Sequence, residues 1–95
     1  MATKTLRLYC SINEDGNAQN PSAGVSMRLN NPDGTVHTAF GAATQDAGVG
    51  TGAYYREFTI NDATDEGGVY TLFYKTTTDG GKTPLGCYPV TVRID

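Results

Sequence analysis

The alternation of apolar and polar residues with a period of two is the feature that most limits what this chain can fold into. In the segment TLRLYCSI, residues 5–12, the apolar side chains at 6, 8, 10 and 12 share one face. Further segments show the same alternation or are rich in aromatic and β-branched residues: 25–30, 35–40, 54–60, 69–77 and 88–94. Because successive side chains of a strand point to opposite faces, each segment predicts a strand with one buried face.

Turn-forming residues separate these segments. Residues 13–24 read as a loop, and the sequence NPDG at 31–34 is typical of a type I turn, which predicts a hairpin of 25–30 with 35–40. Residues 41–53 are expected to form either a mobile connection or a connection with a single helical turn around 42–45. A seventh strand, if the chain has one, would lie in this segment. The 95 residues therefore predict one all-β domain, an antiparallel sandwich or small barrel of six to seven strands.

One stretch resembles a known fold family. The segment FTINDATDEGGVYTLFYK, residues 58–75, is similar to the corner between the fifth and sixth strands of immunoglobulin-like domains, with Glu66, Gly68 and Tyr70 in its acidic-x-Gly-x-Tyr pattern. The resemblance implies that the Tyr70 hydroxyl donates to the backbone of the preceding loop. Gly68 would supply a positive φ or a close approach. For the whole chain, residues 1–95, the resemblance implies a single immunoglobulin-like β-sandwich.

The chain departs from antibody-type domains in two respects. Leu72 stands where those domains carry a cysteine, and the sequence contains no Trp. The resemblance is therefore to the generic immunoglobulin-like sandwiches of cell-surface, bacterial and phage structural proteins, decoration proteins among them. The fold hosts many functions, so it brings no activity with it. Cys10 and Cys87 are either two free thiols or one bridge between antiparallel terminal strands.

Catalytic and cofactor sites have little support in the sequence. The only histidine, His37, lies in a predicted strand, and no serine has a nucleophile-elbow context. The glycine-rich residues 48–53 lack the strand before and the helix after that a phosphate loop requires, so a flexible linker is favoured. A calcium site could be formed by the carboxylates of Asp62, Asp65, Glu66 and Asp79. Acidic side chains in turns more commonly accept backbone N–H bonds and face water, so a structural role is favoured. We expect no enzyme, no metal and no cofactor.

The outward positions of the strands suggest an interface. If the first, third, sixth and last strands share a sheet, as the resemblance implies, their outward residues form an aromatic and basic patch. With Val69, its members are Arg7, Tyr9, His37, Phe73, Lys75, Thr91 and Arg93. Such a patch is either an interaction surface or ordinary surface residues. Arg56 shares its parity with Phe58 and Ile60, so we expect it at a strand end, at a bulge or beside a partner's carboxylate.

The expected function is that of a structural interaction module, most specifically a capsid decoration protein that docks on a viral shell. Its partner would be the major capsid protein or another virion component, and self-association through an edge strand such as 25–30 is open. The net charge of −3 argues against a nucleic-acid partner. No signal peptide or membrane-spanning segment is visible in the sequence. We therefore expect a complete chain that is made in the host cytoplasm and incorporated into the virion. The alternative is a carbohydrate- or cell-surface-binding module using Tyr54, Tyr55 or Tyr88.

Overall fold

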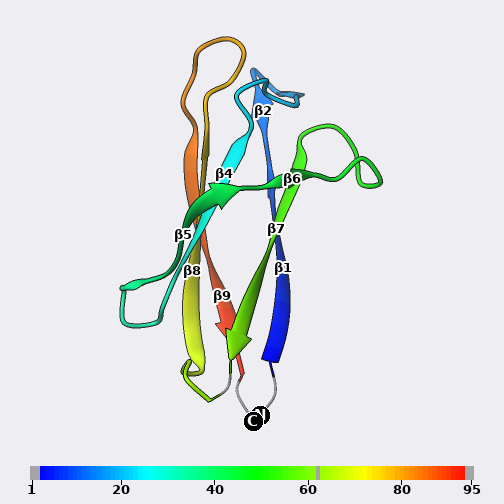
Figure 1. Cartoon of the computed structure of the whole chain (residues 1–95). Helices are drawn as coiled ribbons and strands as arrows, with labels where there is room; N and C mark the ends of the chain where they lie inside the picture. The colour runs from blue at the N-terminus through cyan, green and yellow to red at the C-terminus, as the bar shows by residue number, and fades with distance from the viewer. Residues whose placement is uncertain (1–2, 62, 94–95) are drawn as a thin grey trace.

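A computed structural model describes residues 3–61 and 63–93, which form antiparallel sheets packed in the manner of a β-sandwich (Figure 1). The strands are β1 (Thr3–Ser11), β2 (Asn13–Glu14), β3 (Asn17–Ala18), β4 (Val25–Asn30), β5 (Val36–Ala42), β6 (Thr44–Gln45), β7 (Ala53–Asn61), β8 (Gly68–Thr76) and β9 (Leu85–Val92). The all-β prediction is confirmed. These residues include no helix long and apolar enough to cross a membrane.

The first sheet has the order β1-β7-β6. Strands β1 and β7 pair without a break from Thr3 opposite Asn61 to Ser11 opposite Ala53. The expectation that the first strand shares a sheet with the third, sixth and last strands is therefore wrong. The physical reason is that β1 hydrogen-bonds with β7 along its whole length and with no described strand of the other sheet, so it lies in the sheet opposite β8 and β9.

The second sheet has the order β5-β4-β8-β9. The predicted hairpin of β4 and β5 is confirmed, and its turn is closed by the Gly34 N–H, which donates to the Asn31 carbonyl at 2.9 Å. Strand β4 lies between β5 and β8, so residues 25–30 are not an edge strand as expected. The edges of this sheet are β5 and β9, and Pro89 lies on β9, as its missing N–H predicts.

The core lies between the two sheets and is built from the predicted inward positions. Its buried members are Cys10, Ile12, Val25, Met27, Leu29, Tyr54, Phe58, Ile60, Tyr70, Leu72 and Val92, with Leu6, Leu8, Tyr88 and Val90 packed against them. Ile94, which we also expected inside, lies outside the described residues. The alternation thus placed the buried faces of β1, β4, β7, β8 and β9 correctly.

The two segments that were expected to be irregular contain short strands. Residues 41–53 hold β6 in place of a helical turn, followed by a loop in which the Asp46 carbonyl accepts the Gly50 N–H at 3.0 Å. Residues 13–24 begin with the β2–β3 hairpin, whose turn residues Asp15 and Gly16 have φ of 53° and 81°. The Asp-Gly pair is the sequence signal for such a turn.

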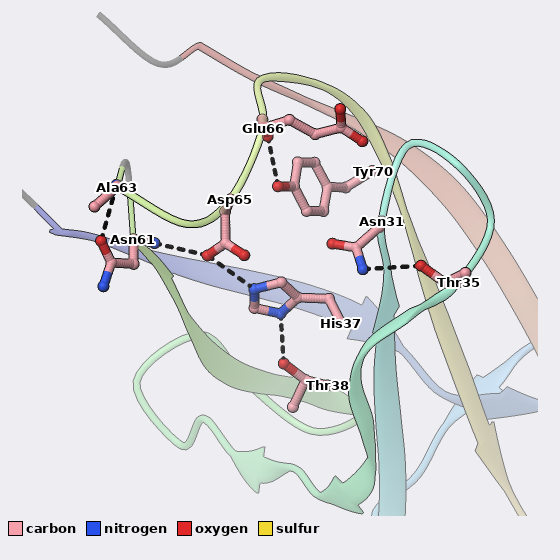
Figure 2. Close-up of polar contacts among 9 residues, drawn as sticks. All are labelled: Asn31, Thr35, His37, Thr38, Asn61, Ala63, Asp65, Glu66 and Tyr70. Atoms are coloured by element: carbon pink, nitrogen blue, oxygen red, sulfur yellow. Dashed lines mark hydrogen bonds and ion pairs between the residues drawn. The ribbon is translucent and has the colours of Figure 1, made fainter.

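The corner before β8 is closed by Tyr70, as the sequence predicts. Its ring is fully buried and its hydroxyl donates to the Glu66 carbonyl at 2.6 Å (Figure 2). Gly68 has φ of 146°, and a Cβ there would lie 3.1 Å from the Pro32 Cγ in the β4–β5 turn. Both expected reasons for a glycine therefore hold, and the corner packs directly against the neighbouring hairpin turn.

Arg56 joins the two sheets. Two residues of β5, Ala39 and Phe40, oppose the single residue Arg28 of β4, so β5 carries a bulge there. The Arg56 Nη1 donates to the Met27 carbonyl at 2.6 Å and to the Ala39 carbonyl at 2.9 Å. The inward parity of Arg56 is thus explained by backbone acceptors at a bulge on the facing sheet.

Gly41 makes room for this contact. A Cβ at Gly41 would lie 2.8 Å from the Arg56 Nη2, closer than real Cβ contacts come. The glycine, the bulge and the arginine therefore form one unit between the sheets.

Candidate functional site

The outer face of the four-stranded sheet carries a cluster of two cations and two aromatic rings, which we call the basic aromatic face. Its members are Arg28 on β4, Phe40 on β5, and Phe73 and Lys75 on β8. Arg28 lies directly opposite Phe73 in the β4–β8 pairing, and the bulge brings Phe40 opposite Arg28 from the other side. The register of three adjacent strands therefore assembles the cluster.

Cation–π contacts hold the cluster together. The Arg28 guanidinium carbon lies 4.5 Å from the centroid of the Phe73 ring and 4.9 Å from that of Phe40. The Lys75 Nζ lies 4.2 Å from the Phe40 centroid. Each such contact at a surface contributes about 0.5–1 kcal/mol, so the two long side chains are held in position before any partner arrives.

The charges of this face are not neutralised by the rest of the described chain. Neither Arg28 nor Lys75 forms an ion pair with a described carboxylate. The Nε of Arg28 is buried and has no hydrogen-bond acceptor among these residues. Arg28 therefore has hydrogen-bonding capacity that the other described residues do not use.

Exposed apolar and polar residues extend the face on β8 and β9. Val69 is 52 % exposed and Leu85 is 69 % exposed, and Thr91 lies opposite Val69. Arg93 follows the end of β9 and is exposed. The sheet thus presents an uninterrupted surface from β5 to β9 with cations at its centre and beyond the end of β9.

Three of the predicted interface residues lie on the outer face of this sheet, Phe73, Lys75 and Thr91, and a fourth, Arg93, directly follows the end of β9. Whether they bind a partner stays a prediction. Arg28 and Phe40 were missed, although Arg28 has the outward parity of the segment VSMRLN. Phe40 has no comparable signal, because the bulges in β5 shift its register with β4.

Arg7 and Tyr9 lie on the other sheet, which corrects their expected place beside Phe73. They belong to a cluster on the outer face of β1 and β7 whose polar groups are paired. Arg7 contacts Glu57 at 3.3 Å and lies 4.3 Å from the Tyr55 ring centroid. The Tyr9 hydroxyl donates to Asp46 at 2.9 Å. This cluster is internally satisfied, in contrast to the basic aromatic face.

His37 points into the corner and not outward, so it too is removed from the expected patch. Its ring packs edge-on against Tyr70 at 5.9 Å between centroids, and its Nε2 lies 3.2 Å from Asp65 Oδ2 (Figure 2). A bulge near His37, where the β4–β5 register shifts again, turns its side chain toward the corner.

Thr38, His37 and Asp65 bring a hydroxyl, an imidazole and a carboxylate together, with Thr38 Oγ1 2.7 Å from His37 Nδ1. That order of groups occurs in nucleophilic enzymes. Here Asp65 also accepts the Asn61 backbone N–H at 2.8 Å, which lowers the pKa of its carboxyl group. The three side chains tie β5, β7 and the corner together, and we interpret them as structural.

The other acidic candidates are separated. Asp65 and Asp79 lie before and after β8, at its opposite ends, and Asp79 accepts the Ser22 N–H at 2.9 Å and its hydroxyl at 2.7 Å. Asp62 lies outside the described residues. Among the residues that the structure does describe, no group of three potential metal ligands comes together.

The tyrosines considered for sugar stacking are largely occupied. Tyr54 is 5 % exposed, and the Tyr55 ring is covered by Arg7. The Tyr88 hydroxyl donates to the Tyr9 carbonyl at 2.7 Å, which joins β9 to β1. Tyr88 also packs partly buried against the core, so all three tyrosines make contacts within the chain.

Both cysteines are free thiols. Cys10 is buried in the core, and Cys87 is exposed on β9. Burial raises the pKa of the Cys10 thiol to about 11. Cys10 points into the core and Cys87 points away from it. The disulfide that the sequence left open is therefore absent.

Comparison of the chain with protein-family models, with curated proteins and with solved structures finds no significant match. A function is therefore inferred from the chemistry of the site and from the resemblance of the corner, not from a relative.

Proposed function

We propose that this domain is a non-enzymatic structural interaction module that docks through the basic aromatic face onto an acidic protein surface. The observation that carries the proposal is Arg28, held between Phe40 and Phe73 with its charge unpaired among the described residues. A guanidinium that contacts two aromatic rings keeps terminal N–H donors, which pair with carboxylates and carbonyls.

The composition of the face supports this role. Arginine and aromatic residues are enriched among the residues that dominate binding free energy at interfaces. Because the rings already restrict Arg28 and Lys75, docking loses less side-chain entropy than it would with free side chains. The chain as a whole carries a net charge of −3, so the cations of this face select where an acidic partner can approach.

The assembly that we propose is a viral capsid, with the domain as a decoration protein on its outer surface. The partner is then the major capsid protein or another virion component, and the domain adds buried area at subunit junctions. This step rests on the resemblance of the corner to immunoglobulin-like domains of phage structural proteins.

An immunoglobulin-like topology is part of the proposal. The orders β1-β7-β6 and β5-β4-β8-β9 correspond to strands B-E-D and C′-C-F-G of such a domain without its first strand. Cys10 then stands on strand B and Leu72 on strand F, where antibody domains form their disulfide. This correspondence accounts for a buried, unbridged Cys10, and the Tyr70–Glu66 bond supports it.

The first test is to fractionate the native source by sedimentation and follow this chain by mass spectrometry. We expect it at fixed stoichiometry with megadalton particles. Its recovery only in the soluble or secreted fraction would overturn the decoration role and direct attention to glycan and receptor screens.

The second test asks whether the basic aromatic face does the docking. Phe73→Ala, Arg28→Glu and Arg93→Glu are expected to abolish particle binding while the circular dichroism spectrum is retained. Arg7→Glu is the matched control, because it makes the same charge change on the outer face of the other sheet. If the face variants dock as well as the control, the assignment of the face is wrong.

A further inference from the structure

An open pocket of about 480 Å³ continues the basic aromatic face toward the loop between β8 and β9. Its lining residues come from the start of β4, the end of β8, the start of β9 and the adjoining loops. These strand ends lie toward the top of Figure 1. Lys75 belongs to both the face and the pocket, and Ser26 lies opposite Lys75 in the β4–β8 pairing. A partner seated on the face therefore reaches this pocket without a break.

The lining combines one cation with hydroxyl groups and an apolar side. Ser26, Thr77 and Thr83 make no side-chain hydrogen bond with other described residues, so their hydroxyls are available to a ligand. The Thr76 hydroxyl, by contrast, donates to the Gly24 carbonyl and closes the floor. Pro84 and the 69 % exposed Leu85 form the apolar side.

We infer that this pocket takes a carboxylate-bearing side chain, next to an apolar residue, from an acidic segment of the docked protein. The inference rests on the proposed function and names the chemistry of the partner. Lys75 has no carboxylate partner among the described residues, and hydroxyl donors surround the same space. A carboxylate accepts several such donors at once, while its apolar neighbour packs on Pro84 and Leu85.

The experiment is a titration of the whole ¹⁵N-labelled chain, followed by amide chemical shifts, with two uncharged-end dipeptides. N-acetyl-aspartyl-leucine amide carries the proposed groups, and N-acetyl-asparaginyl-leucine amide replaces only the carboxylate. We expect the aspartyl peptide to shift the amides of Ser26, Thr77, Thr83 and Leu85. The asparaginyl peptide should bind about ten-fold more weakly, because it loses the charge-assisted contact.

Matched lysine variants locate the charge. Lys75→Gln should remove the preference for the aspartyl peptide, whereas Lys82→Gln should retain it, since Lys82 pairs with Asp15 at 2.8 Å and does not line the pocket. Equal affinity for the two peptides overturns the inference. So does the absence of shifts at these amides up to about 20 mM peptide, well above the Kd expected for a ligand of this size.

The outcome separates this inference from the proposed function. If particle binding depends on Phe73 and Arg28 but the pocket shows no carboxylate preference, only the pocket inference fails. If the pocket prefers the aspartyl peptide but the chain is absent from particles, the decoration role fails and the pocket inference stands.

Discussion

Tyr70 shows how one hydroxyl closes the end of the sandwich. The ring is fully buried, and its only described hydrogen bond runs to the Glu66 carbonyl. We expect Tyr70→Phe to lower the free energy of unfolding by about 1 kcal/mol, because it deletes one hydrogen bond and leaves the packing intact. Urea denaturation measures this loss. Tyr9→Phe is the control: it removes a hydroxyl from an exposed pair and should cost less. An equal effect of both variants would contradict the role of the corner.

The two cysteines should differ sharply in reactivity. Burial holds the pKa of Cys10 at about 11, whereas Cys87 is exposed. Because the thiolate is the reactive form, a chromogenic aromatic disulfide at pH 8 should modify one thiol at once. Cys10 should react at least about 100-fold more slowly, from the pKa and its burial together. Cys87→Ser should remove the fast phase. Two fast thiols in the native protein would contradict the buried position of Cys10.

At the scale of elements, the Arg56 contact links β7 to the bulge of β5. We expect Arg56→Met to destabilise the domain by about 2–3 kcal/mol, because two carbonyls lose a charged donor while the apolar stem remains. Amide hydrogen exchange should accelerate in β5 more than in β9. Arg7→Met removes the same charge from an exposed ion pair and should have a much smaller effect. If the two variants unfold at the same urea concentration, Arg56 does not join the sheets.

The sequence was sufficient to locate the strands whose two faces differ in polarity, but not to predict which strands pair with each other. Alternation located β1, β4, β7, β8 and β9, and the corner pattern identified the acceptor loop of Tyr70. The alternation could not reveal that β1 pairs with β7, because the same pattern of residues fits a strand in either sheet. The basic aromatic face depends on the bulge that brings Phe40 opposite Arg28, and a bulge shifts register without altering the hydrophobic pattern nearby.

Across the whole molecule, carboxylates fasten loops at both ends of the sandwich. Hydrogen bonds from Thr35 hold the pKa of Asp33 below its usual value, those from Tyr9 lower that of Asp46, and those from Ser22 lower that of Asp79. The backbone N–H of Asn61, together with His37, does the same for Asp65. Their positions in four separate loops mean that protonation loosens the fold as a whole.

Stability should therefore fall under acid conditions. Each folded-state pKa is lower than the unfolded one, so the unfolded chain binds more protons in this range. The linked stability is complete above about pH 5 and is lost as pH falls through the lowered values. Urea midpoints measured from pH 7 down to pH 3 should follow this course. Asp65→Asn keeps the acceptor for the Asn61 N–H but cannot titrate, so its midpoint should decline less steeply than that of the wild type. A wild-type midpoint that stays level, or an unchanged slope in Asp65→Asn, would mean that these carboxylates do not bind protons differently in the two states.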